Sequence, residues 1–138
     1  MIDIENELFS MIKSQLEKDY KSIAVYSEEI RTPIAFPCVS IVEEDNYTLM
    51  KTQDSGSNEN HANVMYEVNI YSNKTTGKKT EVKKILSKID DTLILLGFTR
   101  MNKFPVIMDD ATIYRVVARY RGVVSKNHTI YRLSLIHI

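Results

Sequence analysis

The stretch that decides the fold is residues 61–97, HANVMYEVNIYSNKTTGKKTEVKKILSKIDDTLILLG, where the spacing of apolar residues changes along the chain. Between residues 64 and 70 every second residue is apolar, which is typical of a half-buried strand. Residues 72–77 predict a turn. Over residues 82–96 the apolar positions recur every three or four residues, which predicts a helix, and Gly97 is well suited to end it.

The flanking segments extend this pattern into an α+β domain. Apolar residues at helical spacing over residues 4–16 predict an amphipathic helix with Asp3 as its N-cap. A long strand is predicted at residues 112–124, and shorter ones at 22–26, 38–42, 47–50, 98–101 and 129–131. We expect the strands that flank residues 51–60 to form a long hairpin. The order helix, strands, helix, strands predicts a single domain with two helices packed on one face of a mainly antiparallel sheet.

The composition is that of one ordinary globular domain. The chain has 138 residues, of which 43% are hydrophobic and 26% charged, with four glycines and three prolines. No uninterrupted apolar run exceeds four residues, so no membrane-spanning helix is predicted. The first residues are acidic, unlike a secretory signal. We therefore expect a cytosolic protein with no membrane partner.

The net charge of zero conceals two halves of opposite charge. Residues 1–60 contain 12 acidic and 5 basic side chains, whereas residues 61–138 contain 6 acidic and 13 basic ones, which gives −7 and +7. Such asymmetry can indicate binding to nucleic acid or membranes. Two opposite halves can also neutralise each other, or a second copy of the chain.

The residues that usually carry chemistry are few and poorly spaced. None of the three histidines has a second ligand nearby in the sequence, so we expect no metal and no cofactor. Cys38 lies in a predicted strand without basic neighbours and is interpreted as a core thiol. Gly77 and the lysines after it lack the second glycine and the hydroxyl of a phosphate-binding loop. The carboxylate pairs at 90–91 and 109–110 are weak candidates for nuclease metal ligands.

One face of the predicted strand at residues 112–124 carries an arginine row, Arg115, Arg119 and Arg121. The row could contact phosphates or a partner's carboxylates. We favour instead a solvated face balanced by Glu67 on a neighbouring strand. Together with the charged residues elsewhere, it defines a candidate subunit or partner interface. The candidate residues are Arg115, Arg119, Arg121, Glu67, Tyr71, Lys78, Lys79, Lys83, Glu43, Glu44 and Asp45.

Two further segments differ from the rest of the chain. Residues 51–60 are wholly polar, and we expect a flexible loop, represented by Lys51, Asp54, Ser57 and Asn60. Residues 133–138 resemble a translated sequencing adapter, so the expected domain is 1–132 and the remainder a non-native scar. The alternative for this tail is a genuine terminal strand.

Four segments carry a resemblance to a known family. Residues 1–9, 36–47, 64–74 and 110–121 resemble the small tail-terminator (tail-completion, or head-to-tail joining) proteins of long-tailed phages and prophages. The resemblance implies an α+β virion protein without enzymatic activity. It also implies a homo-oligomeric ring, usually of six copies, at the head-proximal end of the tail tube. Such a ring ends tube polymerisation and contacts the tail-tube protein and the head connector.

The same resemblance implies a location in the virion tail or neck, after assembly in the host cytoplasm, and no sequence-specific contact with nucleic acid. The polar segment 51–60 would order on assembly. The resemblance leaves open another neck or head-completion protein as an alternative. The residues alone leave two more: a DNA-binding module that uses the arginine row, and a small nuclease.

Overall fold

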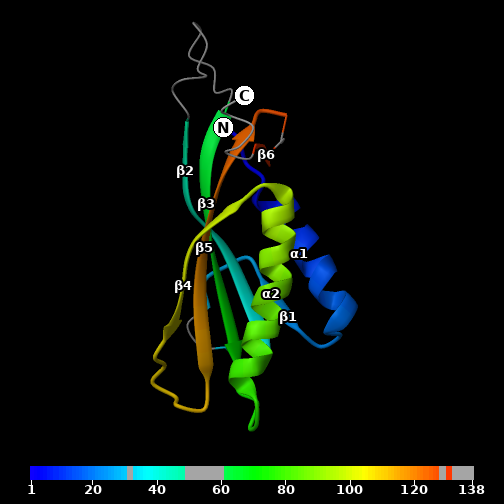
Figure 1. Ribbon diagram of the computed structural model, residues 1–138, viewed down its shortest axis with the longest axis vertical. Helices are drawn as coiled ribbons and strands as arrows, with labels where there is room; N and C mark the ends of the chain where they lie inside the picture. Colours follow the sequence, from blue (N-terminus) through cyan, green and yellow to red (C-terminus); the bar gives the residue numbers. More distant parts are fainter. Residues whose placement is uncertain (31–32, 49–60, 128–129, 132–138) are drawn as a thin grey trace, which may run out of the picture.

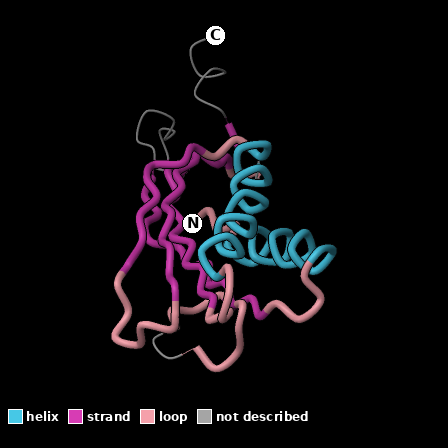
Figure 2. The backbone as a smooth tube through the Cα atoms, turned by 60° about the horizontal axis from the view of Figure 1, so that its bottom comes forward, coloured by secondary structure: helices cyan, strands magenta, loops and turns pink. Residues whose placement is uncertain are grey.

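A computed structural model describes residues 1–30, 33–48, 61–127 and 130–131. The elements in chain order are α1 (Glu5–Asp19), β1 (Ala24–Tyr26), β2 (Cys38–Thr48), β3 (His61–Ser72), α2 (Lys78–Leu96), β4 (Thr99–Val106), β5 (Tyr114–Ser125) and β6 (Ile130–Tyr131). Both helices lie on the same side of the sheet, which confirms the predicted α+β domain (Figures 1 and 2). The predictions for the loop at 51–60 and for the tail at 133–138 fall outside the described residues.

The strands form one sheet in the order β1-β2-β3-β5-β4, and β6 pairs with the end of β5 beyond β4. β1 is parallel to β2, and the remaining neighbours are antiparallel. The predicted long hairpin is confirmed, because β2 and β3 pair from Cys38 opposite Tyr71 to Thr48 opposite Ala62. The strands therefore lie almost in chain order across the sheet.

Three local expectations are corrected. The separate strand predicted at 47–50 is wrong, because its described part belongs to β2, which continues through a bulge between Glu43 and Asp45. β4 extends to Val106, well past its predicted end. Ile4 rather than Asp3 is the N-cap of α1, although the carboxylate of Asp3 accepts a hydrogen bond of 3.0 Å from the Glu5 amide.

The core lies between the helices and the sheet. β3 buries alternate apolar residues toward the helices, as its sequence predicts. Each helix contributes one buried stripe: Leu8, Ile12 and Leu16 in α1, and Val82, Ile85, Leu86, Ile89 and Leu93 in α2. Gly97 ends α2 with a φ of 114°, as predicted. Both described helices pack on this side, so the opposite face of the sheet carries no helix of the described chain.

At one end of the helix-free face, the segment after β1 covers the sheet. The Ser40 hydroxyl donates a 2.8 Å hydrogen bond to the Glu28 carbonyl, and the Tyr71 hydroxyl donates one of 3.1 Å to the Ile30 carbonyl. Cys38 and Tyr71 are consequently buried. The remainder of the face carries the arginine row.

Candidate subunit interface

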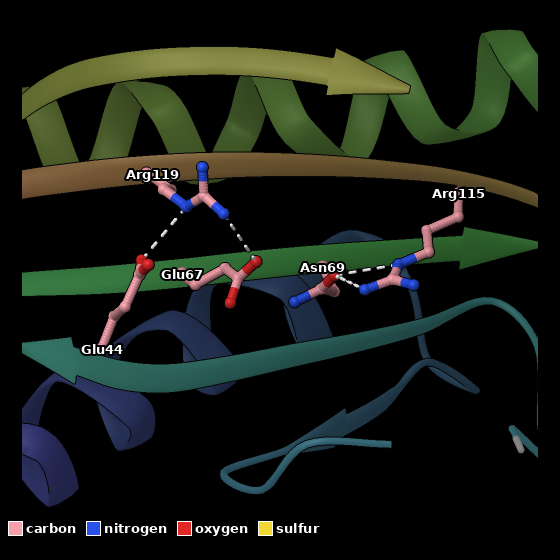
Figure 3. A network of polar contacts seen from close by, with 5 residues as sticks. All are labelled: Glu44, Glu67, Asn69, Arg115 and Arg119. Atoms are coloured by element: carbon pink, nitrogen blue, oxygen red, sulfur yellow. Dashed lines mark hydrogen bonds and ion pairs between the residues drawn. The ribbon is translucent and has the colours of Figure 1, made fainter. Parts of the chain in front are cut away.

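Arg119 lies at the centre of the helix-free face, in an ion-pair network between three strands. Its Nε atom is 3.2 Å from the carboxylate of Glu44 on β2, and its Nη2 atom is 3.7 Å from that of Glu67 on β3 (Figure 3). The guanidinium also lies over the ring of Phe104 on β4, 5.3 Å from its centroid. The Nε contact is an ion pair and not an aligned hydrogen bond, because the buried Nε–H lacks an acceptor in suitable geometry.

Arg115 is held by a neutral partner. Its Nε and Nη2 atoms donate to the Asn69 side-chain oxygen at 3.0 and 2.7 Å (Figure 3). The guanidinium lies 5.4 Å from the centroid of the Tyr71 ring. Burial raises the pKa of the Tyr71 hydroxyl, and the nearby guanidinium of Arg115 acts in the opposite direction. Neutral groups therefore hold Arg115 in position, and no ion pair with a described residue balances its positive charge.

Arg121, the third member of the row, makes no ion pair with any residue that the structure describes. It lies opposite Met65 on β3 and Thr99 on β4 and is partly exposed. The three arginines therefore differ: one is neutralised, one is fixed by an amide, and one is available. The expected balance by Glu67 holds for Arg119. The additional pairing of Arg119 with Glu44 was not predicted, because the strand expected at 38–42 ended before Glu44.

The acidic run at 43–45 is divided between different surroundings. Glu43 lies on the helix side, where its carboxylate accepts hydrogen bonds from the Asn46 side chain at 3.1 Å and the Tyr66 hydroxyl at 3.3 Å. Burial raises the pKa of Glu43, and the nearby carboxylates of Asp3 and Glu5 add to this effect. Asp45 is exposed at the outer edge of the sheet.

The outer side of β2 at this point is hydrogen-bonded to the start of α1 and to the residues before it. The amide of Glu43 donates a 3.0 Å hydrogen bond to the Glu5 carboxylate. The Asn46 side chain donates one of 2.7 Å to the carbonyl of Ile2. The first residues of the chain are thereby tied to the outer edge of β2, and together with Glu43 and Asp45 they form an acidic corner.

The lysines at the start of α2 do not gather into one site. The Lys78 ammonium donates a 3.0 Å hydrogen bond to the Ala111 carbonyl, and Lys79 is exposed. Lys83 lines a shallow groove of about 250 Å³ between α2 and β4, together with Asp90, Asp91, Arg100 and Lys103, among others. Sequence reasoning missed Arg100 and Lys103, which become notable only because β4 lies at the edge of the sheet.

Cys38, Asp90 and Asp110, which were considered for catalysis or metal binding, are either buried or already engaged in hydrogen bonds or ion pairs. Cys38 is 0% exposed, and burial raises its thiol pKa to about 11. Asp90 accepts a 2.6 Å hydrogen bond from the Tyr120 hydroxyl and pairs with Arg100 at 3.2 Å. Asp110 accepts hydrogen bonds from the Thr112 amide and hydroxyl, which lower its pKa.

Neither a metal cluster nor a membrane-spanning helix is found among the described residues. Across the described ranges, no group of three His, Cys, Asp or Glu side chains is placed to hold a metal ion. No helix in the described part of the chain is both long and apolar enough to span a membrane.

Comparison with known proteins gives a likeness of fold. No family model and no curated protein sequence matches the chain. A solved structure titled "Virion of native gene transfer agent (GTA) particle" contains a chain that superposes with a TM-score of 0.56 at 16% sequence identity. The match covers 80% of the present chain and 88% of the other. At this identity the similarity establishes a shared fold over the part of the chain that is matched.

Proposed function

We propose that this chain is a structural virion protein of a phage-like particle, and that it acts as the tail terminator. The observation that carries the proposal is the fold shared with a chain of a gene transfer agent virion over 80% of the present sequence. The segments at 1–9, 36–47, 64–74 and 110–121 support the more specific role, because they resemble tail-terminator proteins.

In this role, copies of the chain form a ring, with six as the proposed number, on the last ring of the tail tube. The ring ends tube polymerisation on one face and binds the head connector on the other. A ring requires heterologous contacts, in which one surface of a copy meets a different surface of the next. The opposite charges of the two halves of the chain favour such contacts.

The arginine row supports a structural role more than a DNA-binding one. Arg119 is shared between two carboxylates, and Arg115 is fixed on Asn69. Phosphate binding by Arg119 would have to displace Glu44 and Glu67. The nuclease alternative is also disfavoured, because Asp90 is already held by a tyrosine hydroxyl and an arginine.

The decisive experiment deletes the gene from the phage or prophage that encodes it and measures the tails by electron microscopy. We expect tails of irregular, extended length that fail to join heads, with normal length restored by a plasmid copy. Immunogold labelling should place the protein at the head-proximal end of wild-type tails. Tails of normal, fixed length in its absence would refute the terminator role. If such tails were also detached from heads, the result would favour the head-completion alternative.

A further inference from the structure

The sheet has two outer edges that face away from each other and carry opposite charge. At one edge, β1 covers β2 only at Cys38–Ser40, so the rest of β2 lies at the margin. This margin carries four carboxylates, and none of them makes an ion pair with a described residue: Asp3, Glu5, Glu43 and Asp45. We name it the acidic edge.

At the opposite edge, β4 pairs only with β5 among the described strands. Its residues Thr99–Lys103 are all exposed, and they include Arg100 and Lys103 but no acidic residue. Arg121 lies beside Thr99 on the adjoining strand. Lys103 and Arg121 make no ion pair within the described part of the chain, whereas Arg100 pairs with Asp90. We name these three cations, with β4, the basic edge.

The strand register places the two edges at the same level. Glu43 lies opposite Tyr66, Tyr66 opposite Tyr120, and Tyr120 opposite Arg100, so one row across the sheet ends in an acid and a base. The next row on the helix-free face runs from Asp45 through Met65 and Arg121 to Thr99. Side chains alternate between the faces of a strand. Glu43 and Arg100 therefore share the helix side of the sheet, whereas Asp45 shares the helix-free face with Arg121, one strand in from the end of its row.

Features at both edges discourage the addition of another strand through backbone hydrogen bonds. On the acidic edge, the amide of Glu43 is already bonded to the Glu5 carboxylate. On the basic edge, β4 contains Pro105 and a bulge between Arg100 and Asn102, features that discourage strand addition. A partner at either edge must therefore be bound mainly through side chains, and charge is what these side chains offer.

We propose that the acidic edge of one copy binds the basic edge of the next, with Glu43 and Asp45 at the level of Arg100, Thr99 and Arg121. The contact is head-to-tail, since a single copy carries both surfaces at opposite ends of its sheet. Such a contact closes into a ring when the rotation between copies permits. The inference rests on the proposed ring and names the surfaces that build it.

Site-specific crosslinking tests the contact. The variant Asp45→Cys/Thr99→Cys has one exposed thiol at each end of a single row, and the native Cys38 is buried. A short bis-maleimide is added both to the concentrated purified chain and to assembled particles that contain it. We expect a ladder of three or more linked chains in at least one preparation. Absence of the ladder from both, or dimers alone, would overturn the proposal. The single variants Asp45→Cys and Thr99→Cys are the controls, and equal crosslinking by either one would also overturn it.

Charge reversal gives a second test that depends on direction. Asp45→Lys and Arg121→Glu should each weaken self-association about tenfold, because each replaces an attraction by a repulsion. Mixed in equal amounts, the two variants should associate again by alternating, since the lysine introduced into one variant then faces the glutamate introduced into the other. Lys84→Glu, an exposed reversal on α2 away from both edges, should leave association unchanged. A mixture no stronger than its components would contradict the head-to-tail contact.

The two proposals fail separately. Overlong tails without the protein, combined with no crosslinked ladder, would leave the terminator role intact and reject the edge contact. A ladder combined with tails of normal length would support the contact and reject the terminator role.

Discussion

Cys38 should be almost unreactive in the folded protein. Burial raises the pKa of its thiol from 9.0 to about 11. At pH 8 the thiolate fraction then falls from about 9% to about 0.1%, roughly a 90-fold loss of the nucleophilic form. The side chain is also 0% exposed, so a reagent reaches it only when the structure opens. We therefore expect reaction at least about 100-fold slower than in the unfolded chain.

The measurement follows a chromogenic disulfide reagent at pH 8, with and without urea. The folded protein should react over hours and the urea-unfolded protein within minutes, and Thr99→Cys should show one additional fast equivalent in the folded state. A folded-state rate for Cys38 within tenfold of the unfolded rate would refute the reasoning. It would also remove the silent background on which the crosslinking experiment relies.

Three further predictions concern stability and can be measured by urea unfolding. Gly122→Ala should lower the free energy of unfolding by about 1–3 kcal/mol, because the new Cβ would lie 2.8 Å from the buried Phe98 ring; an unchanged midpoint would contradict this. Glu43→Gln should stabilise the fold at pH 7, because the folded-state pKa of Glu43 is raised and its charged form is disfavoured. This gain in stability should shrink as the pH falls through the folded-state pKa toward about 4, where the unfolded-state carboxyl also protonates. A gain in stability that does not depend on pH would argue against this explanation. Arg119→Met should cost about 1 kcal/mol in low salt and less in high salt, whereas Arg121→Met, which breaks no ion pair among described residues, should cost less at either salt concentration; equal losses would exclude the network as the cause.

The fold could be predicted from sequence where one periodicity dominates. The stretch 64–70 alternates strictly enough to define a strand, and the apolar spacing over 82–96 together with Gly97 defines α2 and its end. In these stretches the local pattern is sufficient for prediction, because the spacing of the buried residues determines both the type of element and the face that it turns toward the core. The hairpin across residues 51–60 followed from the strands expected on either side of that polar segment, although the first of these was placed at 47–50 and not over the whole of β2.

The errors arise where tertiary contacts override local pattern. Charged residues in the middle of β2 suggested two short strands, whereas pairing with β3 continues through a bulge. Glu43 and Glu44 point to opposite faces as simple alternation requires, but the bulge then places Asp45 on the helix-free face with Glu44, which no period-two reading of the run would show. The importance of Arg100 and Lys103 depends on strand order, and strand order is not encoded in the sequence of β4 alone.

The charge split becomes meaningful only through this strand order. The acidic half of the sequence supplies α1, β1 and β2, and the basic half supplies β3, α2, β4 and β5. Since the sheet order β1-β2-β3-β5-β4 nearly follows the chain, the −7 and +7 halves end at opposite margins and do not interleave. Had β4 been inserted between β2 and β3, Arg100 and Lys103 would have neutralised the acidic edge within one copy. The observed topology leaves Lys103, Arg121 and the acidic edge without ion pairs among the described residues. Under the proposed edge contact, these charges give a chain of zero net charge a direction in which to assemble.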